Sequence, residues 1–345
     1  MIFRDVRVGL VLGGGAARGL AHIGVLKVLE RAKIPVHFIA GTSIGALIGG
    51  VYASQHGATA MEKRFHAFVH SKEFKRDEFD FLMESRHSKP GILYSVANLV
   101  RKGIFYSLSV AKTSFISAEH FTHNISSLLD DVRIEDLPLP LAVLAVDIDT
   151  AEEVMFTSGP LRRTVAASCA IPGLMPPIEI DGRRLIDGGW IHKVPVLPAF
   201  QMGADIAISV DISKEIDDAR TLRKGFDIMV RANAIKAEAL KRLQCSFADV
   251  LIEPQVGHIH WADFSALDEA VAAGERAAEA ALPAIQKLLM RKRLPPRMRF
   301  FSGKRLARLF LERLQGHRVH ASADAGADRE RLPQRPKGKA TAQRR

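Results

Sequence analysis

The sequence predicts an α/β fold in which a mostly parallel central sheet carries helices on both faces. Three observations predict it. Short apolar runs alternate with segments of helical periodicity over the first 55 residues. Glycines stand where the first two of these runs meet the helical segments, as expected of strand-to-helix turns. Further apolar runs of strand length recur between residues 139 and 254.

The first part of the pattern is a strand–helix–strand–helix unit. Residues 7–12 and 36–40 are the predicted strands, because both are short and apolar and are followed by glycine. Residues 16–32 place apolar side chains at helical spacing, and residues 44–55 form a helix whose small side chains allow close packing on a sheet. A helix that joins two strands of one sheet makes a right-handed crossover, so the two strands are expected to be parallel.

Later segments complete the sheet. The remaining predicted elements are strands at 139–149, 152–157, 204–212 and 248–254, a short hairpin at 176–189, and helices near 219–243 and 266–290. The strand at 152–157 is expected to pair with its predecessor as a hairpin. The hairpin at 176–189 is expected to turn at Asp181-Gly182, because Asp-Gly suits a two-residue turn.

The length of 345 residues suits one large α/β domain with additions. We assign that domain to residues 1–290, with a helical, aromatic-rich insertion at about 65–135. Eight of the 18 Phe and two of the three Tyr lie within 65–121, interleaved with Lys and Arg. Two interpretations of these aromatics are compatible with each other: a helical subdomain with its own core, and a lining or cap for an acyl-chain site.

The chain carries its excess of positive charge at the C-terminal end. Residues 291–345 hold 17 Lys/Arg and 4 Asp/Glu, so the rest of the chain holds 32 basic and 34 acidic residues. Within the basic segment, residues 304–314 could form an amphipathic helix, and the residues after about 318 have a composition typical of disorder. Contact with an anionic membrane, a solvated tail and nonspecific nucleic-acid contact are all open, with nucleic acid the least favoured.

Cysteine usage and the N-terminus favour a cytoplasmic, soluble protein. Two cysteines, Cys169 and Cys245, do not make a disulfide framework in a chain of this size, and small buried residues are the simpler interpretation of both. The N-terminus has the pattern of a first strand and lacks that of a signal peptide. Peripheral contact at the inner face of the membrane is a further expectation, resting on the basic segment.

A glycine-rich loop, LGGGAARG at residues 12–19, follows the first predicted strand and opens a helix. It lacks the Gly-Lys-Ser/Thr ending of a P-loop and the Gly-x-Gly-x-x-Gly spacing of a dinucleotide loop. Two interpretations remain. In the first, the glycines serve only a tight turn. In the second, the bare amides at the helix start form an oxyanion hole, since a helix N-terminus favours negative charge.

Ser43 lies in the sequence Gly41-Thr42-Ser43-Ile44-Gly45, between a predicted strand and a predicted helix. This fits the Gly-x-Ser-x-Gly nucleophile elbow, whose sharp turn exposes the serine hydroxyl. A plain helix-capping serine is the alternative. A serine nucleophile needs a base, usually histidine, but none of the 13 His has a clear setting for that role.

Asp187, in LIDGGWIHKVPV, is the candidate base. Asp-Gly is a common turn dipeptide, yet Asp181-Gly182 already supplies the nearby turn. A carboxylate bonded directly to the Ser43 hydroxyl could take its proton without histidine. Because aspartate is a weak base, with a pKa of about 3.9 in water, such a pair would depend on orientation and on an oxyanion hole.

Three motifs now stand in order along the chain: the glycine-rich loop at 12–19, the elbow around Ser43, and Asp187-Gly188-Gly189. Together they resemble the patatin-like phospholipase family, and particularly its bacterial branch. The resemblance covers roughly residues 5–255, and residues 166–177 also resemble the family's segment before the Asp strand. It implies a three-layer patatin-like fold and a Ser–Asp dyad, with Ser43 as nucleophile and Asp187 as general base.

The same resemblance implies that Gly14, Gly15 and Ala16 donate hydrogen bonds in the oxyanion hole. Ala16 stands where many members have glycine, so we expect a hole with less room. The supporting motif positions are Gly13, Arg18, Gly19, Gly41, Gly45, Gly188 and Gly189.

The implied activity is hydrolysis of carboxylic esters of phospholipids or lysophospholipids, and the dyad chemistry implies no metal and no cofactor. A lipid ester is therefore the expected partner. Two alternatives remain: a catalytically idle lipid- or protein-binding scaffold with this fold, and an acyltransferase that uses the same dyad.

Overall fold

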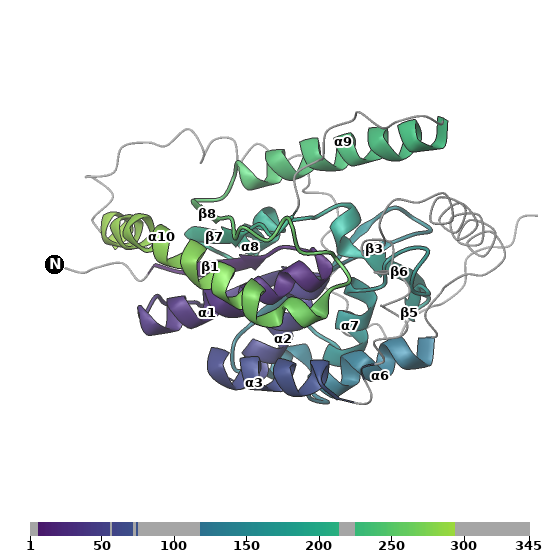
Figure 1. The fold of residues 1–345 in the computed structure, drawn as a ribbon, viewed down its shortest axis with the longest axis horizontal. Coiled ribbons are helices and arrows are strands. Elements are labelled where there is room, and N and C mark those ends of the chain that lie inside the picture. The colour runs from purple at the N-terminus through teal and green to yellow at the C-terminus, as the bar shows by residue number, and fades with distance from the viewer. Residues whose placement is uncertain (1–5, 56, 72–73, 75–117, 214–224, 294–345) are drawn as a thin grey trace, which may run out of the picture.

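The computed structural model describes residues 6–55, 57–71, 74, 118–213 and 225–293 of the chain. Within these residues, eight strands form one sheet in the order β5-β6-β3-β2-β1-β7-β8, with β4 paired to β3 outside that path (Figure 1). The strands are β1 (Val8–Leu12), β2 (Phe38–Thr42), β3 (Leu141–Asp147), β4 (Glu153–Phe156), β5 (Ile178–Ile180), β6 (Arg183–Asp187), β7 (Ile206–Val210) and β8 (Val250–Ile252).

The sheet is mostly parallel, as predicted. Strands β1, β2, β3, β7 and β8 run parallel to their neighbours in this group, whereas β4 and β6 are antiparallel to β3, and β5 is antiparallel to β6. Every residue of β1, β2, β3 and β7 is buried. Strands buried on both faces are the arrangement expected of a parallel sheet covered by helices.

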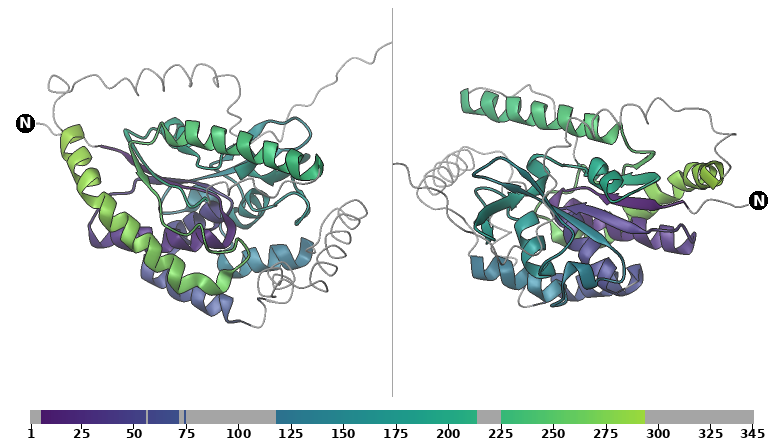
Figure 2. Two further views of the ribbon diagram at one scale, coloured as in Figure 1. Left: turned by 45° about the horizontal axis from the view of Figure 1, so that its top comes forward. Right: turned by 180° about the vertical axis from the view of Figure 1, so that it is seen from behind.

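Helices cover both faces of the sheet, which gives the predicted three layers (Figures 1 and 2). The α-helices of the described residues are α1 (Ala21–Arg31), α2 (Ile44–Gln55), α3 (Ala58–Val69), α6 (Ala118–Leu128), α7 (Leu161–Ser168), α8 (Val196–Gln201), α9 (Gly225–Cys245) and α10 (Leu267–Arg293). The larger apolar cluster joins the sheet to α1, α2, α3, α7 and α10, and the smaller one joins it to α8. Strand β1 serves both, since Leu10 belongs to the larger cluster and Val11 to the smaller.

Most predicted elements appear near their predicted positions. The predicted helix at 16–32 begins as a 3-10 turn, η1 (Ala16–Leu20), before continuing as α1. The predicted strand at 36–40 runs on to Thr42, and the hairpin at 176–189 forms as β5 and β6. Helices α7 and α8 were not among the predicted elements.

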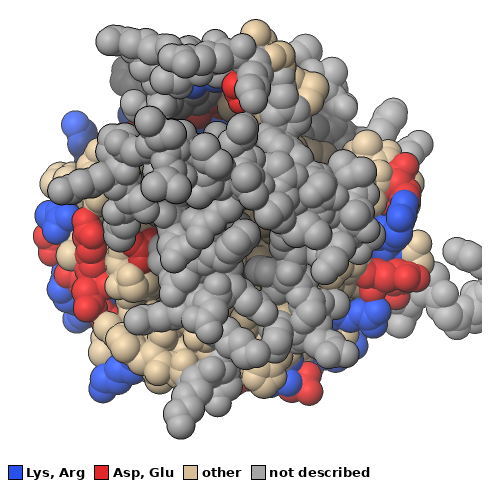
Figure 3. Space-filling model, turned by 45° about the vertical axis from the view of Figure 1, so that its right-hand side comes forward, with Lys and Arg blue, Asp and Glu red and all other residues tan. Residues whose placement is uncertain are grey.

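Two predicted segments lie largely outside the described residues. Of the aromatic-rich insertion, residues 75–117 are not described, while α3 and α6 lie at its two ends. Residues 294–345, which hold most of the basic segment, are not described either. On the face shown in Figure 3, acidic and basic side chains are interspersed over the described surface, in keeping with the near balance of charge outside the basic segment. Among the described residues, no helix is both long and apolar enough to cross a bilayer.

Candidate active site

Strand β3 brings Ser43 and Asp187 together through its register. Along one edge β3 pairs first with β2 and then with β6, so that Leu144 is the partner of Thr42 and the next residue, Ala145, is the partner of Asp187. Strand β4 occupies the opposite edge. The carboxyl ends of β2 and β6 therefore meet end to end, because neighbouring residues of a strand are only about 3.3 Å apart.

Ser43 occupies a tight elbow between β2 and α2. Its φ of 55° lies in the left-handed region, which few residues other than glycine adopt. Gly45 makes the elbow possible, since a Cβ atom there would lie 2.1 Å from the carbonyl oxygen of Leu12. The Ser43 carbonyl accepts hydrogen bonds from the amides of Ala46 (2.9 Å) and Leu47 (3.0 Å), which starts the helix at this residue.

Ser168, a buried serine that the sequence analysis did not identify, holds the backbone of the elbow. The Ser43 amide donates to Ser168 Oγ (2.9 Å), and the Ser168 hydroxyl donates to the carbonyl of Leu144 (2.6 Å). Ser168 thus ties the elbow to β3 beside the point where Asp187 pairs. Ser168 lies in residues 166–177, and the resemblance of that segment to the family was the signal that could have identified it.

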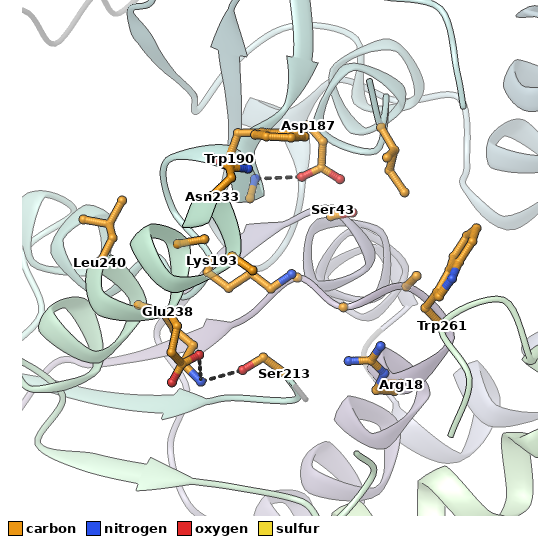
Figure 4. Close-up of a pocket in the computed structure, with 18 of the residues that line it drawn as sticks. Arg18, Ser43, Asp187, Trp190, Lys193, Ser213, Asn233, Glu238, Leu240 and Trp261 are labelled. Carbon is orange, nitrogen blue, oxygen red and sulfur yellow. Dashed lines mark hydrogen bonds and ion pairs between the residues drawn. The ribbon is translucent and has the colours of Figure 1, made fainter. Parts of the chain in front are cut away.

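Asp187 is the last residue of β6 and is buried, with 6 % of its surface exposed. Its amide donates to the carbonyl of Ala170 (2.9 Å), and its Oδ1 accepts from the amide of Gly189 (2.7 Å). Figure 4 shows its carboxylate directed toward Ser43. Gly188 lets the chain turn here, because a Cβ atom at this position would lie 2.3 Å from the carbonyl oxygen of Leu144.

The surroundings of Asp187 change its acidity. Burial raises the pKa of the carboxyl group above its usual value, and this effect outweighs the nearby Ser43 hydroxyl, the hydrogen bond from Gly189 and the charge of Lys193, which all lower the pKa. Burial also lowers the pKa of Lys193, against the attraction of Asp187. A carboxylate with a raised pKa is a stronger base than one in water.

The glycine loop lies beside Ser43, since a Cβ atom on Gly14 would be 3.4 Å from that of Ser43. The Gly14 amide donates to the carbonyl of Lys193 (2.9 Å), so it is not available to an anion in this structure. Of the three predicted donors of the oxyanion hole, Gly15 and Ala16 therefore remain. The amides of Gly15 and Ala16 make no hydrogen bond to any described residue that would occupy them, as expected for the first residues of a helix.

His22 holds the same loop from inside the protein. It is fully buried, and its Nε2 lies 2.8 Å from the carbonyl oxygen of Gly13. Burial lowers the pKa of His22 to about 4, so the ring is neutral at pH 7 and its Nε2–H donates to that oxygen. The sequence analysis assigned no role to this histidine, and its position one turn beyond Arg18 was the available signal.

Most of the predicted site residues line one cavity, whose volume is about 760 Å³. Figure 4 shows Ser43, Asp187 and Arg18 around it, together with Lys193, Trp190 and Trp261, which the sequence analysis did not assign. The predicted residues on its wall are Gly14, Gly15, Ala16, Arg18, Ser43, Asp187 and Gly189. The others, Gly13, Gly19, Gly41, Gly45 and Gly188, are not on the wall and shape the backbone behind it.

Comparisons with known proteins identify the family of the chain. A family model described as "Patatin-like phospholipase" matches residues 10–200. The chain is 33% identical over 218 residues to lysophospholipase NTE1 of Yarrowia lipolytica, which covers 63% of this chain and 13% of that protein. It is 34% identical over 208 residues to an uncharacterized NTE family protein of Mycobacterium bovis, covering 60% of this chain and 49% of the relative.

The chain thus spans a minor part of the Yarrowia protein and about half of the mycobacterial one. Among solved structures, VipD from Legionella pneumophila matches with a TM-score of 0.43 and 15% sequence identity, over 83% of this chain and 68% of that chain.

The raised pKa of Asp187 predicts a stability that depends on pH. Ionised Asp187 destabilises the folded protein, because burial disfavours its charge. This loss of stability is absent below the pKa that Asp187 has in the unfolded chain and complete above its pKa in the folded protein. Asp187→Asn should therefore melt at a higher temperature than the native protein at pH 8, by about 2–4 °C for each kcal/mol relieved. The difference should shrink as the pH falls toward about 4.

Thermal unfolding monitored by circular dichroism between pH 4 and pH 8 measures this difference. Asp181→Asn, on the exposed turn between β5 and β6, is the matched control for loss of one negative charge. An Asp187→Asn protein that is less stable than the native one at pH 8 would contradict the expectation.

Proposed function

The chain belongs to the patatin-like phospholipase family, and on that premise we propose that it is a serine acyl hydrolase that cleaves carboxylic esters of phospholipids or lysophospholipids. The observation that carries the proposal is the meeting of Ser43 and Asp187 in one cavity, beside the amides of Gly15 and Ala16, which donate to no described residue. A lysophospholipase among the relatives is consistent with such a substrate.

In the proposed mechanism, Ser43 Oγ attacks the ester carbonyl while Asp187 accepts the hydroxyl proton. The carbonyl oxygen becomes the oxyanion of a tetrahedral intermediate, which the Gly15 and Ala16 amides stabilise. Asp187 then gives the proton to the leaving alcohol, and an acyl ester remains on Ser43. Asp187 then takes a proton from a water molecule, which attacks that ester, and gives the proton to Ser43 Oγ as the fatty acid is released.

The surroundings of the dyad suit this chemistry. Burial makes Asp187 a better base, and Lys193 offsets part of the cost of its negative charge. Arg18 lines the same cavity and is anchored by a hydrogen bond from its Nε to the carbonyl of Ile259 (3.2 Å). Lys236, Lys241 and Glu238 also line the cavity, so its charged side chains are mostly basic, which favours a substrate that carries a phosphate.

Apolar side chains supply the rest of the wall. Ile171, Leu174, Trp190, Trp261 and Leu240 line the cavity, and they offer the surface that an acyl chain requires. The earlier interpretation of the aromatic-rich insertion as a cap over this site concerns residues that are mostly outside the described part of the chain.

The proposal predicts that both members of the dyad are required. Ser43→Ala and Asp187→Asn should each lower the hydrolysis of a short-chain nitrophenyl ester and of lysophospholipid by roughly 10³-fold or more, because the nucleophile or its base is lost. A fluorophosphonate probe should label the native protein and not Ser43→Ala. Ser54→Ala is the control, since Ser54 lies on the same helix, outside the cavity wall, and its hydroxyl donates to the carbonyl of Gly50.

Unchanged hydrolysis in either dyad variant would refute the assignment, and a native protein that takes no label and cleaves neither ester would favour an idle scaffold. Acyl transfer to added lysolipid or alcohol in place of water would reassign the reaction to an acyltransferase.

We also propose that residues 291–345 contact the anionic inner face of the membrane, on the strength of their 17 basic and 4 acidic residues. A chain that ends at Arg293, the end of α10, should bind phosphatidylglycerol vesicles at least tenfold more weakly than the full chain at low salt, since each Lys or Arg near such a surface contributes about 1 kcal/mol. Co-sedimentation measures the difference. Equal binding by both chains would exclude this role, and binding of duplex DNA without binding of vesicles would favour nucleic acid instead.

A further inference from the structure

Helix α9 carries an apolar stripe on its outer side. Ile228, Ala232, Ile235, Ala239 and Leu243 follow one another at intervals of three or four residues, so they lie along one side of the helix. We call these five residues the α9 stripe. The exposed fractions of its large members are 57% for Ile228, 53% for Ile235 and 52% for Leu243. Figures 1 and 2 show α9 along the outside of the molecule.

A different side of the same helix forms a wall of the candidate active site. The α9 residues that line the cavity are Asn233, Ala234, Lys236, Ala237, Glu238, Leu240 and Lys241, and none of them belongs to the stripe. The C-terminal end of α9 is anchored to the body through Lys241, which pairs with Asp211 (3.1 Å), and through Gln244, which donates to the carbonyl of Ile191 (2.7 Å). One helix thus separates the substrate cavity from an exposed apolar surface.

We propose that the α9 stripe docks on a lipid surface and holds the cavity next to the lipid from which its substrate comes. This inference rests on the proposed function. Exposed apolar side chains on a soluble surface cost free energy unless they meet an apolar partner. A lipid surface is such a partner, and it also contains the proposed substrate. The cavity that would bind this substrate lies about one helix diameter, roughly 10 Å, from the stripe.

The charges that border the stripe suit anionic headgroups. Lys236 is exposed and lies at the border between the stripe and the cavity, and Arg242 is exposed on the other flank. The acidic residue between them, Glu238, faces inward and forms ion pairs with Lys241 (3.0 Å) and Arg242 (2.8 Å). Long basic side chains at the edge of an apolar helix face can place their charges among lipid phosphates.

A second copy of the chain is a less suitable occupant. Stable protein–protein interfaces use about 20–30 residues on each side, whereas the stripe offers five. An amphipathic helix, in contrast, binds a lipid surface with one apolar side alone.

The first test is the full-length triple variant Ile228→Gln, Ile235→Gln and Leu243→Gln, with Met290→Gln as control. Met290 is an exposed apolar residue of α10, with 65% of its surface exposed. Binding to phosphatidylglycerol vesicles is measured by co-sedimentation at about 0.5 M salt, which screens the charges of the basic segment. The triple variant should bind roughly tenfold more weakly than the native chain or worse, since three apolar contacts are lost, and the control should bind like the native chain.

Hydrolysis separates docking from chemistry. The triple variant should cleave a soluble short-chain nitrophenyl ester within about twofold of the native rate, because no stripe residue lines the cavity, and it should cleave vesicle lipid at least tenfold more slowly. Vesicle binding is measured as well in the Ser43→Ala background, so a failure of the proposed ester chemistry would leave the docking result intact.

A second variant keeps the surface apolar and tests insertion directly. Ile235→Trp should gain fluorescence that brominated lipids quench, whereas the added fluorescence of Met290→Trp should not be quenched. Unchanged vesicle binding by the triple variant, or an unquenched Trp at position 235, would overturn the proposal. So would a native chain that sediments as a dimer and becomes a monomer on the triple substitution.

Discussion

The pairing of strand β3 is the constraint on which the site depends. Along one edge this strand pairs with β2 up to Leu144 and with β6 from Ala145, so the ends of two strands that are distant in the sequence face each other. The proximity of Ser43 and Asp187 follows from that register. A shift of one residue in either pairing would turn the side chains to the opposite face of the sheet. Ser168 reinforces the register, because it joins the Ser43 amide to the carbonyl of Leu144.

The three sequence motifs are also physically connected. The Gly14 amide donates to the carbonyl of Lys193, which ties the glycine loop to the segment that follows Asp187. His22 holds the carbonyl of Gly13 in the same loop, and Gly45 lets the elbow approach the end of β1. Ser43 and Ala16 both adopt left-handed φ values, which cost energy and persist where surrounding contacts enforce them. Burial of Asp187 adds to this cost while it makes the carboxylate a better base.

Local patterns predicted the parts of the protein whose causes are local. The strands around residues 7–12 and 36–40 and the helix at 44–55 follow from short-range periodicity and from the glycines that end them. Helices α7 and α8 were missed because they are eight and six residues long, too short for a periodic signal. Ser168 and Lys193 act through contacts with distant segments, which spacing along the chain does not report, and His22 acts through a turn that brings it back to Gly13. The use of the Gly14 amide by Lys193 is likewise a tertiary contact, so Gly14 could not be separated from its neighbours by motif alone.

The central claim is that Ser43, Asp187 and the amides of Gly15 and Ala16 form one reacting site. A crystal structure of the protein after reaction with a fluorophosphonate tests it most directly, because the tetrahedral phosphorus mimics the intermediate of ester hydrolysis. The phosphorus should be bonded to Ser43 Oγ, with one of its oxygens within hydrogen-bond distance of both amides. An adduct on another residue, or one whose oxygens all point away from those amides, would contradict it.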